Sequence, residues 1–311
     1  MVTADSRVVA TVQGESLDDA WVAPMAALGS AKPITSHGSL NDPTWSPDGR
    51  IVYSSGVDGN IWVMGSDGSN PKQLTSNAEG DFLFLPRVSP DGHYIVSPSL
   101  HSGLVQLWRM DSDGNNPKQL TDSFASVGSN CSPDGKWVVW GSKFDSEKGV
   151  WKVPMEGGNS VRLSDAEAEH PIISPDGKTI AYSYEDPSAN PPQGVAIMAF
   201  EGGPATKHFD IFSSIGTSFR WGADSRSLLY TKNEGGVDNI WSQPIAGGKP
   251  KQMTHFKSEL ISSFDLSRDG KRLVMSRGTI KHDVLLIRDL RWHQLVHRVY
   301  RVKPAKSEIL G

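Results

Sequence analysis

The chain has 311 residues, 37% of them hydrophobic and 21% charged, so it can bury a large core and does not have the composition of a disordered chain. Its net charge of -4 excludes a general electrostatic attraction to nucleic acid or anionic lipid, and no nucleic-acid partner is expected. The single cysteine, Cys131, excludes an intramolecular disulfide framework and is expected to be a small core side chain.

Neither a transmembrane segment nor a signal peptide is visible. No apolar run reaches about 18 residues, the length needed to span a bilayer. The N-terminus, MVTADSRVVATVQGES, lacks a basic start followed by an apolar block. These absences predict a cytoplasmic chain without membrane insertion, and they leave open a longer parent protein that is membrane-associated or periplasmic.

A repeat marked by one aspartate runs through the chain. The tetrapeptide SPDG begins at Ser46, Ser89, Ser132 and Ser174, and SRDG, GADS and TADS are looser copies. The markers are Asp5, Asp48, Asp91, Asp134, Asp176, Asp224 and Asp269. They are separated by 43, 43, 43, 42, 48 and 45 residues, a regularity typical of repeat architectures.

In chain order, each unit offers four short strands. β-forming residues follow the marker, as in RIVYSS (50–55), and a second strand often carries tryptophan, as in IWVM (61–64). A third strand such as KQLT (72–75) comes next, and a fourth, such as PRVS (86–89), leads into the following marker. With turn signals between them, these strands predict an all-β fold over residues 1–290: a seven-bladed β-propeller of four-stranded antiparallel blades, with six blades as the alternative.

The SPDG tetrapeptide favours a turn over a catalytic motif. Proline presets the first corner, aspartate bonds its own backbone two residues on, and glycine supplies the positive φ that completes the reversal. A serine nucleophile would need a histidine partner that no repeat supplies. The tryptophans at equivalent second-strand places are interpreted as wedges between blades: Trp21, Trp62, Trp108, Trp151 and Trp241.

The pattern W-S-P-D-G-R-I-V-Y-S-S…G-N-I-W-V-M…D-G-S-N-P-K-Q-L-T resembles the TolB-type, WD-repeat-like propeller family, from Thr3 to about Leu290. The segments at 239–278 and 283–290 are similar to the C-terminal sensor propellers of bacterial, particularly acidobacterial, proteins with an upstream kinase or winged-helix domain. The resemblance implies a sensing or binding module. No G-x-S-x-G elbow, phosphate-binding loop or kinase loop is present.

The two ends of the chain depart from the repeat. The first unit lacks its innermost strand and the last unit lacks its outermost strand. We therefore expect a fragment of a longer protein, and the blades at its two ends could be incomplete. Residues 291–311 form a basic, non-repeat tail in which LVHRVYRV has strand-like composition and is a candidate to fill one vacancy. Unfilled edges would favour a homo-oligomer.

Polar residues just before the markers are expected to converge on the channel. We interpret Asn41, Arg87, Asn130 and Arg220 as ligand-binding candidates. The metal candidates are Asp42, Glu169, His170 and Asp265, whose oxygen ligands favour Ca²⁺ or Mg²⁺ while His170 admits Zn²⁺ or Mn²⁺. The alternative to a ligand or metal site is a water-filled channel whose polar walls are merely solvated. The proline-rich segment 185–194, in the longest interval, is the candidate rim loop, with a tolerated insertion as its alternative.

Two functions from different classes follow. The first is a non-catalytic, sensor-like module that binds a protein or small ligand through a rim or the channel. The second is a metal-dependent hydrolase, lactonase or phosphotriesterase-like, that uses a cation in the channel. The missing catalytic motifs favour the first function.

Overall fold

The computed structural model of this chain separates into two compact units. One is Asp18–Gly278, and the other comprises Met1–Leu17 with Thr279–Gly311. The structure describes residues 8–36, 38, 40–76, 85–100, 104–122, 128–143, 147–186, 188, 190–211 and 218–288. Over these ranges, no helix has both the length and the apolar character needed to cross a membrane.

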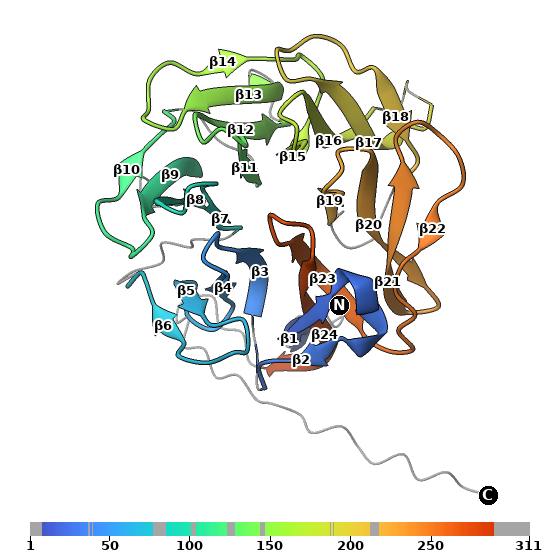
Figure 1. The fold of residues 1–311 in the computed structure, drawn as a ribbon. Helices are drawn as coiled ribbons and strands as arrows, with labels where there is room; N and C mark the ends of the chain where they lie inside the picture. Colours follow the sequence, from blue (N-terminus) through green and yellow to red (C-terminus); the bar gives the residue numbers. More distant parts are fainter. Residues whose placement is uncertain are drawn as a thin grey trace, which may run out of the picture. The chain divides into compact units, whose positions relative to one another are not determined.

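The described strands form six four-stranded sheets, and in the larger unit these sheets surround a common axis (Figure 1). We number these blades in chain order and give the innermost strand first. Blade 1 comprises β3 (Leu40–Trp45), β4 (Ile51–Ser55), β5 (Ile61–Met64) and β6 (Lys72–Gln73). Blade 2 comprises β7 (Arg87–Val88), β8 (Tyr94–Ser99), β9 (Gln106–Asp111) and β10 (Lys118–Gln119). Blade 3 comprises β11 (Ser129–Cys131), β12 (Trp137–Ser142), β13 (Gly149–Pro154) and β14 (Val161–Arg162).

The next two blades follow the same plan of antiparallel neighbours. Blade 4 comprises β15 (Glu169–Ile173), β16 (Thr179–Glu185), β17 (Gln193–Ala199) and β18 (Lys207–Phe209). Blade 5 comprises β19 (Phe219–Trp221), β20 (Ser227–Glu234), β21 (Val237–Pro244) and β22 (Lys251–Gln252).

Blade 6 is built from both ends of the repeat region. Its inner strands are β23 (Leu260–Leu266) and β24 (Arg272–Arg288), and its outer strands are β1 (Val8–Pro24) and β2 (Lys32–Pro33), in the order β2-β1-β24-β23. A short 3-10 helix, η1 (Met25–Ser30), joins β1 to β2.

The prediction of seven blades was therefore wrong, and the alternative of six is what the structure shows. The marker count exceeds the blade count because the first and last repeats are two halves of one sheet. The strand missing from one repeat is supplied by the other, so each of the six sheets has four strands. The marker Asp5 and the tail 291–311, with its strand candidate LVHRVYRV, lie outside the described residues.

The SPDG turns have the predicted geometry. In blade 3, Ser132 Oγ donates to Asp134 Oδ1 at 2.6 Å, and the Lys136 backbone N–H donates to the same oxygen at 3.1 Å. These hydrogen bonds, that of Ser132 first, lower the pKa of the Asp134 carboxyl. Gly135 completes the turn with φ of 73°. The motif is confirmed as the hairpin between the first two strands of a blade.

The tryptophans lie on the second strand after the marker, as predicted, which is the third strand of the blade counted from the innermost one. Trp151 packs against a core cluster that combines Val96 and Leu107 of blade 2 with Val138 of its own blade. Trp241 packs in the same way against a cluster shared by blades 4 and 5. The wedge interpretation is confirmed at these two positions, since each ring fills the space between neighbouring sheets.

Candidate functional site

The innermost strands bring one residue from every blade to the hub, at a fixed place in the repeat. The residue four places before the marker aspartate lines a cavity of ≈ 310 Å³ in all six blades. These hub residues are Thr44, Arg87, Asn130, Ile172, Arg220 and Asp265. The strand register fixes their places, because each pairs with an apolar residue of the second strand, as Asn130 pairs with Val139. Residues remote in the chain thus share one wall.

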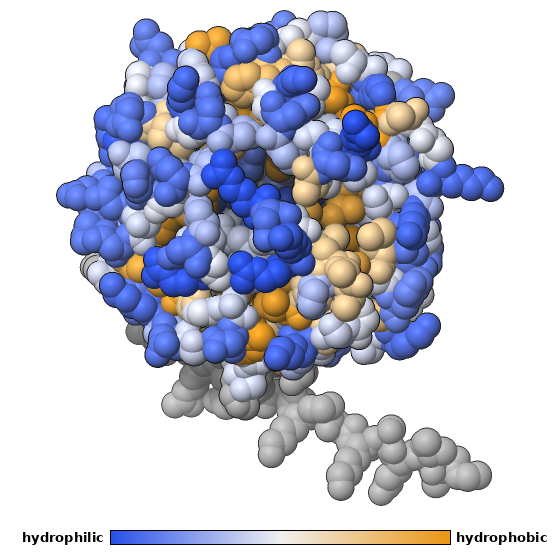
Figure 2. Space-filling model, in the orientation of Figure 1, coloured by the Kyte–Doolittle hydropathy of each residue, from blue (hydrophilic) through white to orange (hydrophobic). Residues whose placement is uncertain are grey.

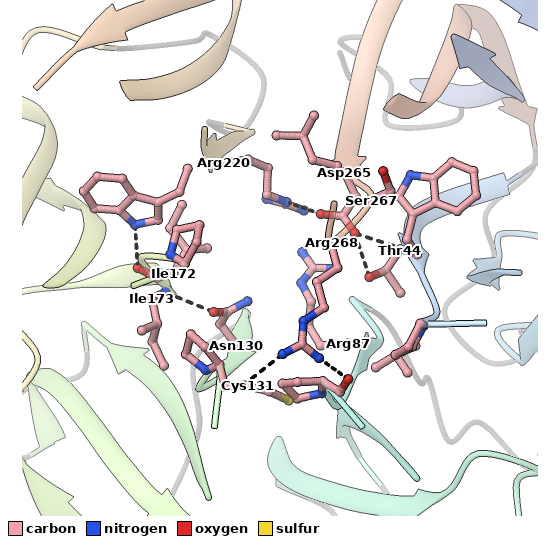
Figure 3. A pocket seen from close by; sticks show the side chains of 18 of the residues that line it. Thr44, Arg87, Asn130, Cys131, Ile172, Ile173, Arg220, Asp265, Ser267 and Arg268 are labelled. Atoms are coloured by element: carbon pink, nitrogen blue, oxygen red, sulfur yellow. Dashed lines mark hydrogen bonds and ion pairs between the residues drawn. The ribbon is translucent and has the colours of Figure 1, made fainter. Parts of the chain in front are cut away.

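The SPDG turns form the mouth of this cavity. The position directly before the marker contributes Pro47, Pro90, Pro133, Pro175, Ala223 and Arg268 to its lining. Only Arg268 has a long side chain there, and its guanidinium donates to the carbonyl oxygen of Pro90 and, at 3.4 Å, to that of Pro133. Arg268 therefore reaches from blade 6 to blades 2 and 3 (Figure 3). Figure 2 shows the hub hollowed and bordered by hydrophilic side chains.

A smaller cavity of ≈ 120 Å³ adjoins the hub residues on the side where the innermost strands begin. The residue six places before the marker lines it in every blade: Asp42, Leu85, Gly128, His170, Ser218 and Ser263. Arg87, Ile172 and Arg220 line both cavities.

The backbone at the smaller cavity is unusual for non-glycine residues. Asp42, Leu85 and His170 have φ of 50°, 52° and 51°, in the left-handed region. The register of blades 1 and 4 shifts at the same place, next to Asp42 and His170. Such a bulge redirects side chains locally, and here it directs the Asp42 and His170 side chains to the cavity wall.

Hydrogen bonds link the hub residues of neighbouring blades. Asp265 Oδ2 accepts from Thr44 Oγ1 at 2.9 Å and from the Trp45 backbone N–H at 3.1 Å, while its Oδ1 lies 3.3 Å from Arg220 Nε (Figure 3). The Ile173 backbone N–H donates to Asn130 Oδ1 at 3.0 Å. The Asp265 carboxylate is thus fully engaged in joining blades 5, 6 and 1.

The electrostatics of the hub are set by burial. Burial first, and then the like charge of Arg87, lower the pKa of Arg220 to about 10, against the opposing effect of Asp265. Burial raises the pKa of Asp42, although Arg87 and Arg220 act in the other direction. Burial likewise lowers the pKa of His170 and raises that of Cys131 to about 12. These shifts favour the neutral forms of Asp42, Cys131 and His170.

The residues suggested by the sequence divide into three groups. Arg87, Asn130, Arg220 and Asp265 share the larger cavity, and Asp42 and His170 share the smaller one. Asn41 and Glu169 line neither cavity. The Glu169 carboxylate lies 3.2 Å from Lys143 Nζ instead.

Three hub positions escaped the sequence reasoning: Thr44, Ile172 and Arg268. The residue types of the first two carry no signal of their own, and only their constant offset of four places from the marker identifies them. Counting back four places would have found both. Arg268 could have been found as the arginine in the proline place of SRDG.

The metal candidates do not come together as one ligand set. Asp265 is engaged by Arg220, Thr44 and a backbone N–H, and it lines a different cavity from Asp42 and His170. In the part of the chain that the structure describes, no three His, Cys, Asp or Glu side chains are placed to hold an ion.

A wider hollow of ≈ 830 Å³ lies away from the hub, against strands of blades 3 and 4. Its cation, Lys148, lies 3.7 Å from Glu167 Oε2 and is therefore already paired. Tyr184 and His208 in its wall contact each other edge to face, with ring centroids 5.0 Å apart. We favour the hub over this hollow because all six blades contribute to the hub.

Comparison with known proteins supports the fold that the repeats predict. Residues 4–171 match the family model described as the TolB beta propeller domain. The chain belongs to this family. A search of curated proteins finds no match.

Solved structures with the same fold include two TolB proteins. A putative TolB from Agrobacterium tumefaciens matches with a TM-score of 0.68 and 17% identity, over 85% of this chain and 99% of that one. TolB from Acinetobacter baumannii matches with a TM-score of 0.61 and 19% identity, over 86% of this chain and 66% of that one. An oligogalacturonate lyase in complex with manganese matches with a TM-score of 0.54 and 17% identity, over 90% of this chain and 82% of that one. At these identities the likeness concerns the fold alone.

Proposed function

We propose that this TolB-type propeller is a non-catalytic, sensor-like binding module whose ligand, a small molecule or a protein segment, enters the hub through the mouth formed by the SPDG turns. The observation that carries the proposal is the convergence of one residue from each blade on a cavity of ≈ 310 Å³. Concave sites of roughly this size, with a few convergent polar groups, are typical of ligand sites.

The candidate nucleophiles at this cavity are already engaged. Ser89 Oγ and Ser267 Oγ each donate to the aspartate of their own turn, at 2.5 and 2.6 Å. The thiol of Cys131, with its pKa of about 12, stays protonated at neutral pH. His170 lines the smaller cavity. Among the described contacts, its side chain forms no hydrogen bond with a serine or a cysteine. These features favour binding over acyl or phosphoryl chemistry.

The test compares the hub with the rim. Ile172 lies in the wall of both cavities, so Ile172→Trp is expected to fill the passage between them. The matched rim variant replaces Pro191 and Pro192 of the 185–194 loop, which joins β16 to β17, with alanine. Native mass spectrometry of the folded proteins, after exposure to a bacterial extract, measures what each retains. We expect a ligand on the wild type and on the rim variant and none on Ile172→Trp. If Ile172→Trp retains the ligand and the rim variant loses it, the binding site is the loop and not the hub.

The metal-dependent hydrolase is the second candidate function. The observation that favours it is that Asp42 and His170 share the smaller cavity. A propeller of the same fold, an oligogalacturonate lyase, is known in complex with manganese, which shows that this fold is compatible with a metal ion. Elemental analysis together with a chelator titration of the melting temperature tests it. Stoichiometric metal whose removal lowers the melting temperature would support the hydrolase, and the absence of both effects would remove it.

A further inference from the structure

Arg87 is a buried cation that forms no ion pair with any carboxylate among the described residues. The residue is only 8% exposed, and its Nη1 donates to the carbonyl oxygen of Pro86 at 2.9 Å. Among the described residues, no Asp or Glu forms an ion pair with it, whereas its counterpart Arg220 has Asp265. A guanidinium carries five N–H donors, and burying its charge unpaired is costly.

The two hub arginines lie on opposite sides of the axis. Arg87 belongs to blade 2 and Arg220 to blade 5 of a ring of six, so three blade steps separate them in either direction. Their like charges repel across the axis, and this repulsion adds to burial, the larger cause, in lowering the pKa of Arg220. The charged residues that line the larger cavity are the three arginines Arg87, Arg220 and Arg268 and one carboxylate, Asp265, whereas Asp42 lines only the smaller cavity. Because Asp265 pairs with Arg220, the larger cavity has an excess of positive charge.

Further donors face the same space. Asn130 uses Oδ1 to accept from the Ile173 N–H, which leaves its NH₂ on the cavity side (Figure 3). Arg268 adds a third guanidinium at the mouth, where its hydrogen bonds to described residues go to the carbonyl oxygens of Pro90 and Pro133. A charged acceptor would replace these neutral acceptors with stronger, charge-assisted bonds.

From these contacts we propose that the larger hub cavity binds the anionic group of a small molecule, a carboxylate or a phosphate, between Arg87 and Arg220 and beneath Arg268. The inference rests on the proposed function, because it takes the hub as the binding site and adds the chemical class of the ligand. Guanidinium groups suit both anions because their N–H donors match two oxygens at once. The volume of ≈ 310 Å³ suits a small metabolite.

Calorimetric titration with succinate, inorganic phosphate and the uncharged analogue succinamide tests the proposal. Succinate or phosphate should bind and succinamide should not, and the anion that binds more tightly identifies the carboxylate or phosphate source. Arg87→Gln should weaken binding on the order of 10- to 100-fold, the worth of a charge-assisted hydrogen bond. The affinity of Arg87→Lys should lie between those of the wild type and Arg87→Gln. The control Arg162→Gln, on the exposed outer strand β14, should bind like the wild type.

Each other outcome overturns the proposal in a recognisable way. Failure of both anions to bind overturns it, even if the extract experiment still yields a hub ligand. If succinamide binds as tightly as succinate, or if Arg87→Gln binds the anions like the wild type, the hub remains a binding site but its preference for an anion is refuted. Should Arg87→Gln fail to fold, the exposed Arg268→Gln provides the same comparison, with a smaller expected loss and the same controls.

Discussion

Two arginines at equivalent places in the repeat have opposite energetic roles. Arg220 is held by Asp265 at 3.3 Å, whereas Arg87 donates to its neighbouring carbonyl and has no carboxylate partner in the described part of the chain. Removing one member of a buried pair strands the other charge, whereas removing an uncompensated charge relieves a cost. The two residues should therefore respond differently to the same substitution.

We expect Arg220→Gln to lower the free energy of unfolding by about 3 kcal/mol, because it leaves the Asp265 carboxylate without its cation. Arg87→Gln should raise it by about 1 kcal/mol, because it removes the repulsion with Arg220. Chemical denaturation of both variants beside the wild type measures the difference. Equal destabilisation by the two substitutions would contradict the assignment of Arg87 as an unpaired cation.

His170 should make stability depend on pH. Burial lowers its pKa below the ordinary value of 6.5, so between the two values the unfolded chain binds more protons than the folded one. The contribution is fully present above pH 6.5 and is lost as the pH falls through the folded pKa. His170→Asn, which tolerates φ of 51°, should flatten this fall in melting temperature. The exposed control His93→Asn should not, and a flattened profile in both would assign the effect elsewhere.

At the scale of the element, the SPDG turn is a unit that packs against the next turn. Gly270 and Gly135 occupy the same place in their turns, with φ of 67° and 73°. A Cβ on Gly270 would lie 2.4 Å from Ala223 Cβ, whereas one on Gly135 would have no atom within 4 Å. The two glycines share a conformational requirement and differ only in their neighbours.

Alanine at these positions separates the two effects. Gly135→Ala should cost about 1 kcal/mol for the left-handed conformation alone. Gly270→Ala should cost a further ~1–3 kcal/mol because the turn must move away from Ala223. Equilibrium unfolding checks the difference, and equal costs would show that the turns do not pack against each other around the mouth.

The elements themselves were the part of the structure most accessible from the sequence. Ser-Pro-Asp-Gly predicts its turn because the hydrogen bonds that shape the turn lie within about five residues, as those of Ser132 and Asp134 show. The hub residues were only partly predictable. Arg87 and Arg220 stood out as charged residues in strands, but nothing local distinguishes Ile172 or Thr44, whose role depends on where five other strands place them. The engagement of Asp265 by Thr44 joins residues 221 positions apart and has no signal in a single sequence.

At the scale of the whole molecule, the seven markers predict one blade too many because the first and the last repeats belong to the same blade. Both halves of blade 6 look like repeats, and only the sheet order β2-β1-β24-β23 shows that they share one sheet. Contacts in the larger unit support this closure. Ser276 Oγ of β24 lies 2.6 Å from Leu40 O of blade 1 and 3.2 Å from Asp18 Oδ2 of β1.

Deletion of residues 1–36 should therefore open the ring. It removes β1 and β2, so it strips blade 6 of two strands and leaves β24 as an unpaired edge. We expect a lower melting temperature and concentration-dependent association, because unpaired edges recruit other chains. Light scattering and thermal unfolding report both effects. A deleted protein that keeps the oligomeric state of the wild type at all concentrations and melts like it would contradict closure through blade 6.

The central claim is that the six blades gather a positively charged site at the hub, and a crystal structure determined with the tighter-binding anion, succinate or phosphate, tests it most directly. The account predicts density for the anion in the larger cavity, within hydrogen-bonding distance of the Arg87 guanidinium, with Arg268 turned from the Pro90 and Pro133 carbonyl oxygens toward it. An empty hub, with the anion bound elsewhere on the protein, would contradict it.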